Sequence, residues 1–139
     1  MVLSKATRLT LSKLAAVSIA GAGLAHSAAP PATKATPLMT RPLAGIPGKE
    51  AMMLTVDFPP GADSPSHRHN ANTFVYVLEG SVIMQVAGGP VMTLRAGDTF
   101  YESPTDVHSV AKNASATEPA RILVFFVKDE GAPATLPVK

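Results

Sequence analysis

The stretch Thr-Phe-Val-Tyr-Val-Leu-Glu-Gly at residues 73–80 decides the fold class of this chain. β-Branched and aromatic residues dominate it, and such side chains suit a pleated strand. Successive side chains of a strand point to opposite faces, so the odd-numbered residues share one face and the even-numbered residues the other. Both faces are largely apolar, which indicates a strand that is covered on both sides.

Runs of the same kind occur at 51–58, 81–86, 91–95, 98–102, 107–112 and 121–127. Glycine, proline or aspartate separates these runs, and such residues suit the turns between strands. No run keeps a period of 3.6 residues. Seven short strands at this spacing predict an all-β sandwich or small barrel.

The even-numbered face of 73–78, formed by Phe74, Tyr76 and Leu78, needs a cover. One candidate is the segment 38–46, and the other is a second copy of the chain. A contiguous apolar patch is a usual sign of association, so we expect a homodimer.

The first 27 residues have the layout of a secretory signal peptide. Lys5, Arg8 and Lys13 precede an uncharged apolar run at 14–25, and small residues follow at cleavage-site spacing in 25–28. An amphipathic first helix is excluded because the run has no polar face. The run is also shorter than the roughly 20 residues of a membrane span. We therefore expect export to a periplasm or the outside, with no stable membrane span once the leader is removed.

Two further segments follow the leader. Residues 28–37 are rich in Ala, Pro and Thr, which predicts a flexible linker, and 38–139 form the predicted β-barrel domain.

The charge balance changes when the leader is removed. Nine of the twelve Lys and Arg then remain against all ten Asp and Glu, so the net charge is −1 with neutral histidines. This is not the basic surface of a nucleic-acid-binding protein, and we expect no nucleic-acid partner. The absence of cysteine excludes disulfides, thiolate metal sites and a cysteine nucleophile.

Beyond the leader the chain has three histidines, His67, His69 and His108. Residues i and i+2 of a strand share a face, so the first two imidazoles can reach one ion. A third from a neighbouring strand completes a three-histidine site with open positions for water or substrate. The alternative for each histidine alone is an ordinary surface or core residue.

The surrounding pattern resembles the cupin superfamily, in particular its small single-domain members. In the first cupin motif, Gly61 is followed by five residues and then by His67-Arg68-His69, and Gly80 falls at the final glycine. In the second motif, Gly97 and His108 keep the usual separation. The resemblance covers about residues 50–128. It implies a double-stranded β-helix, the jelly roll of the cupins, with a metal ion held by the three histidines.

Three positions depart from the cupin motifs. Thr73 stands where the first motif has a glutamate ligand. Pro104 is one place late, with Asp106 near the usual glycine, and Asn113 follows His108 by five positions instead of four. A neutral three-histidine shell leaves both charges of a divalent ion uncompensated, so we expect an anionic small-molecule ligand.

We expect one divalent transition metal ion, and imidazole accepts Fe, Mn, Ni, Cu or Zn. Further candidates to line the pocket are Thr73, Tyr76, Gln85 and Glu102. Glu102 is either a base or replacement ligand near the ion, or an exposed glutamate at a strand end. The motifs assign no catalytic residue.

Three functions remain open. The first is a metalloenzyme acting on a small molecule, either dioxygenase-like or isomerase- or decarboxylase-like. The second is a non-catalytic cupin that binds a metal or small ligand. The third, a structural β-domain, leaves the grouping of the three histidines unexplained.

Overall fold

The structure, a computed structural model, describes residues 29–138, so the leader predicted at 1–27 lies outside the described residues. Its strands are β1 Lys34–Pro42, β2 Lys49–Phe58, β3 Asp63–Ser64, β4 His67–Arg68, β5 Ala71–Glu79, β6 Ser81–Val86, β7 Met92–Arg95, β8 Thr99–Glu102, β9 His108–Asn113, β10 Ala120–Asp129 and β11 Leu136–Pro137. The seven runs predicted from sequence correspond to β2 and β5–β10. Within 29–138 no helix is long and apolar enough to cross a membrane.

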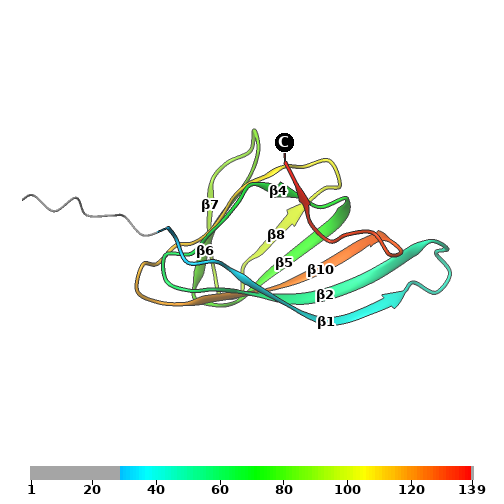
Figure 1. The fold of residues 1–139 in the computed structure, drawn as a ribbon, viewed down its shortest axis with the longest axis horizontal. Helices are drawn as coiled ribbons and strands as arrows, with labels where there is room; N and C mark the ends of the chain where they lie inside the picture. The colour runs from blue at the N-terminus through cyan, green and yellow to red at the C-terminus, as the bar shows by residue number, and fades with distance from the viewer. Residues whose placement is uncertain (1–28, 139) are drawn as a thin grey trace, which may run out of the picture.

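The strands form two antiparallel sheets. The first has the order β1-β2-β10-β5-β8, and the second has β11-β4-β9-β6-β7 with β3 paired to β9. Figure 1 shows β1, β2, β10 and β5 side by side as one layer, with β4, β6 and β7 on the other side of the molecule. The predicted all-β class and the double-stranded β-helix are confirmed.

The core lies between the two sheets and follows the alternation of each strand. On β5 the odd-numbered residues from Ala71 to Val77 are buried, and on β10 Phe126 is buried. The second sheet contributes Val82 and Met84, which have no exposed surface. Burial of such side chains stabilises the fold by about 1.5–3 kcal/mol each.

The outer face of β5 is not covered by the segment 38–46, so the first of the two candidate covers is excluded. Phe74, Tyr76 and Leu78 are 47%, 45% and 43% exposed. The first part of the segment continues β1 at the sheet edge, where β2 and β10 separate it from β5. A strand added at an edge extends the sheet and leaves its faces open.

The flexible linker predicted over 28–37 must also be corrected. Residues 34–37 form the first half of β1 and pair with β2, from Lys34 opposite Asp57 to Pro37 opposite Leu54. Proline has no backbone N–H and is confined to edge strands, and β1 is an edge strand. A segment rich in Ala, Pro and Thr therefore suits an exposed edge strand such as β1 as well as a flexible linker.

Asn113 connects three parts of the backbone. Its buried side-chain amide donates to the carbonyl oxygens of Phe58, Pro59 and Glu118, and its side-chain oxygen accepts from the Ser115 N–H. This uses the hydrogen-bonding capacity of a carboxamide almost fully. Asn113 of the second motif is therefore a structural residue, which fixes the loop after β9.

Candidate metal centre

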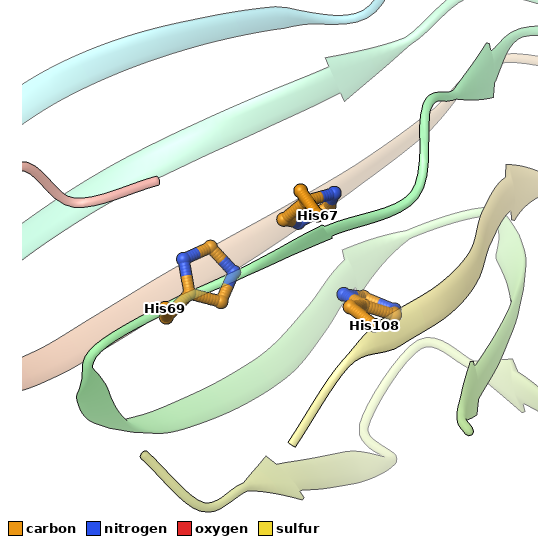
Figure 2. A group of neighbouring side chains, drawn as sticks. All are labelled: His67, His69 and His108. Carbon is orange, nitrogen blue, oxygen red and sulfur yellow. The ribbon is translucent and has the colours of Figure 1, made fainter. Parts of the chain in front are cut away.

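The three histidines converge in one place. His67 begins β4, His108 begins β9, and the two are opposite each other in the antiparallel pairing of these strands. His69 follows directly after β4. The ring centroids of His67 and His69 lie 4.9 Å apart and those of His67 and His108 lie 5.0 Å apart. Figure 2 shows the three rings gathered between these segments, and one ligand atom from each lies within 4.8 Å of the others.

Hydrogen bonds to backbone carbonyls orient two of the rings. His67 Nδ1 lies 2.8 Å from the carbonyl oxygen of Pro65, and His69 Nδ1 lies 2.5 Å from that of Ala134. A carbonyl oxygen only accepts, so each Nδ1 must carry the proton and donate it. In a neutral imidazole the other nitrogen, Nε2, then keeps its lone pair free to coordinate an ion.

The sequence contains no signal for these two carbonyl partners. Ala134 belongs to the segment between β10 and β11, and β11 pairs with β4 so that Pro137 lies opposite His67. Every residue has the same backbone carbonyl whatever its side chain is. Only the folded path of the chain therefore reveals which carbonyls accept from the histidines. The last residues of the chain therefore help to position His69.

A cavity of about 470 Å³ lies beside the histidines. Its wall is largely apolar and is built mostly from the inward faces of both sheets, with these main contributors: Leu54, Phe58, Val75, Met84, Val124 and Phe126. The three histidines and Glu102 line the same cavity. The space therefore has one polar end and an apolar body.

Of the four candidate pocket residues, Thr73 and Glu102 are buried and opposite each other on β5 and β8, and Glu102 lines the cavity. Thr73, Tyr76 and Gln85 are not among the residues that line the cavity, contrary to expectation, although Thr73 is buried directly beside Glu102. Tyr76 belongs to the outer face of β5. Gln85 follows inward-facing Met84 on β6, and its side-chain amide donates to the carbonyl oxygen of Gly89. Alternation along a strand sends neighbouring side chains to opposite faces.

Buried polar atoms without a hydrogen-bond partner gather at this site. Within residues 29–138 these side-chain atoms are Oγ1 of Thr73, Oε2 of Glu102, and both ring nitrogens of His108. An unpartnered buried polar atom is costly, and native proteins rarely keep several together without a ligand or ion. Imidazole nitrogens with a carboxylate beside them are donors that divalent transition metals accept. The residues present therefore fit such an ion.

Burial affects the ionisation of His67. Removal from water lowers its pKa below the usual value, neighbouring His108 and His69 lower it further, and the hydrogen bond to Pro65 opposes the shift. The neutral ring, which is the form that coordinates a metal, is therefore favoured.

This pKa shift predicts a pH-dependent stability for the metal-free protein. The folded pKa of His67 is lower than the unfolded pKa of about 6.5, so below that pH the unfolded chain binds the proton more readily. The free energy of unfolding should therefore fall as the pH decreases through about 6.5. Urea unfolding with a chelator at several pH values measures this, and His67→Gln should show a shallower dependence. Identical pH profiles for both proteins would contradict the assignment to His67.

Comparisons with known proteins identify the family. The cupin domain family matches residues 54–126, which is more than half of the chain. The chain therefore belongs to the cupin family. A search of curated proteins returned no match.

Solved structures with the same fold include several cupins. A cupin-like protein from Thermotoga maritima MSB8 is 23% identical with a TM-score of 0.60, over 75% of this chain and 74% of that one. An oxalate oxidase is 26% identical with a TM-score of 0.59, over 76% and 55%. The DMSP lyase DddQ from Ruegeria pomeroyi DSS-3 is 22% identical with a TM-score of 0.56, over 63% of this chain and 43% of the lyase. The chain thus spans less than half of that lyase.

Proposed function

We propose that this chain holds one divalent transition metal ion with His67, His69 and His108 and acts as a metalloenzyme on a small molecule. The observation that supports this most directly is the orientation of the rings. The Nδ1 hydrogen bonds of His67 and His69 leave Nε2 of each ring free, and one ligand atom from each of the three rings lies within 4.8 Å of the others beside the cavity. A small molecule in the cavity can reach the open positions of such an ion.

The ligand is an anion in this proposal. Three neutral imidazoles do not balance a divalent ion, so a negative group on the bound molecule is favoured. The apolar wall of the cavity suits an uncharged body behind that group. A small organic acid or an enolizable compound has this chemistry.

Within the enzyme class we favour oxygen chemistry over isomerisation or decarboxylation. The similarity to an oxalate oxidase, at 26% identity, supports this choice. The DMSP lyase, at 22% identity, indicates only a shared fold. A bound iron, manganese, nickel or copper ion can bring dioxygen beside an activated substrate.

The test begins with elemental analysis of the protein purified from the cells that produce it. We expect iron, manganese, nickel or copper at a molar ratio to the chain of about one. We also expect oxygen uptake with at least one member of a panel of enolizable acids. Zinc alone would turn the proposal away from oxygen chemistry. A metal-replete preparation that remains empty would overturn the metal centre.

The second candidate is a non-catalytic cupin that binds a metal or small ligand. The threonine at position 73, where the first motif has its glutamate, favours it. Tight retention of a ligand without turnover, under the same panel, would support this candidate against the enzyme.

We also propose that the outer face of β5 and its neighbours forms a homodimer interface. Phe74 lies 5.3 Å from Tyr101 and 6.2 Å from Phe125 between ring centroids, so two exposed aromatic residues and the half-buried Phe125, from three strands, form one patch. Such a patch favours association. Sedimentation at micromolar concentration should give twice the chain mass, and a monomer would contradict the interface.

Export remains part of the proposal, on the strength of the basic, apolar and small-residue layout of 1–27. The destination is a periplasm or the outside of the cell. N-terminal sequencing of the protein from its producing cells should begin at Ala28, and a start at Met1 would contradict export.

A further inference from the structure

The carboxylate of Glu102 lies at the metal centre although the cupin motif has no ligand at this position. We propose that Glu102 is a fourth protein ligand of the ion, supplied by β8 in place of the glutamate that the first motif has at position 73. The inference rests on the proposed metal centre and deepens it.

The pairing of β5 with β8 explains how one residue can replace the other. Thr73 and Glu102 are directly opposite in this antiparallel pair, and both side chains are buried. Opposite residues on one face have Cβ atoms only about 4.5–5.5 Å apart. A carboxylate from position 102 therefore reaches the space beside position 73, while the short threonine leaves room for it.

The distances match those of ligands that share an ion. Oε1 of Glu102 lies 3.2 Å from His108 Nδ1, and Oε2 lies 3.9 Å from His69 Nε2. Two atoms that each coordinate an ion at about 2.1 Å lie roughly 3 to 4 Å apart for bond angles of about 90° to 140°. The Nε2 of His69 is also the nitrogen that its hydrogen bond to Ala134 leaves free.

A role limited to orienting His108 fits less well. A carboxylate that orients a ligating histidine accepts a hydrogen bond from the ring nitrogen that faces away from the ion. His108 Nδ1 makes no hydrogen bond to Glu102 despite the short distance, and Oε2 has no hydrogen-bond partner within the described chain. Two ligand atoms that direct their lone pairs at the same ion lie close together in this way, with no hydrogen bond between them.

Burial adds a reason from charge. Glu102 is 2% exposed, and within residues 29–138 its only ion-pair contacts are His69 and His108. A buried carboxylate needs a positive charge close by, since its removal from water is costly. No lysine or arginine of the described chain supplies that charge at ion-pair distance, and a divalent ion would. The carboxylate would in turn reduce the excess charge of the site from +2 to +1.

The experiment uses Zn²⁺ alone with the full mature chain and moves the carboxylate between the two strands. The variants are Glu102→Gln, Glu102→Thr and the exchange Thr73→Glu/Glu102→Thr, with Glu79→Gln as a matched control on an exposed glutamate of β5. Circular dichroism confirms that each is folded. Competition with a chromogenic chelator gives the Kd, and infrared difference spectra on zinc addition detect a carboxylate that becomes coordinated.

We expect both single variants at position 102 to weaken zinc binding at least about tenfold and to lose the coordinated-carboxylate band. The exchange variant should regain the band and most of the affinity, and the control should match the wild type. Wild-type affinity in Glu102→Thr, persistence of the band in Glu102→Gln, or a folded exchange variant no better than Glu102→Thr would overturn the role of Glu102. Failure of the wild type to bind zinc would instead overturn the metal centre.

Discussion

The substitution His108→Ala is expected to lower the affinity for Zn²⁺ by more than about 100-fold. Loss of a residue that only orients a ligand already costs up to about 100-fold, and this substitution removes a ligand itself. His108 supplies the imidazole on β9, and the other two come from the single segment around β4. Without it no ligand from the second motif remains. The ion would keep His67 and His69 and at most the carboxylate of Glu102.

A matched control is available on the same strand. Ser109 is the next residue of β9, and its hydroxyl donates to the carbonyl oxygen of Gln85, away from the histidines. Ser109→Ala should leave the zinc Kd unchanged within about twofold, because it removes one partly buried hydrogen bond and no ligand. The Kd by chelator competition and the thermal midpoint are measured for both variants. Retention of wild-type affinity by a folded His108→Ala protein would exclude this histidine as a ligand.

The strands could be predicted because their signals are local. Alternation along 73–78 and the Gly, Pro and Asp residues between runs depend on neighbouring residues, and these predicted β2 and β5–β10. The first half of β1, at 34–37, has no such local signal, because Ala, Pro and Thr suit an exposed edge strand as well as a linker. The pairing partner that distinguishes the two lies about twenty residues away along the chain.

The histidines could be predicted for a different reason. Their spacing within two motifs is itself a long-range signal, and the structure brings His67 and His108 opposite each other. The pocket residues had no such support. Tyr76 and Gln85 point away because strand register decides the face, whereas Glu102 points inward from the strand beside Thr73. Register between distant strands is set by the folded sheet and leaves little trace in either segment.

The second large effect concerns Gly80, the final glycine of the first motif, which stands in the turn between β5 and β6. Its φ is 69°, in the left-handed region, and a Cβ there would overlap the carbonyl oxygen of Pro119 and lie 2.9 Å from Cα of Ala120. Both contacts are with backbone at the start of β10, where no flexible side chain can move aside. This glycine lets the turn pass directly against β10.

Gly80→Ala should therefore lower the free energy of unfolding by roughly 3 kcal/mol or more, since the left-handed conformation alone costs about 1–2 kcal/mol and the contact adds to it. Gly88→Ala separates the two causes, because Gly88 has a φ of 81° and open space around its missing Cβ. That variant should lose only about 1–2 kcal/mol. Urea unfolding of both variants measures the difference. Equal losses would show that backbone strain alone sets the penalty and that β10 yields to the added methyl group.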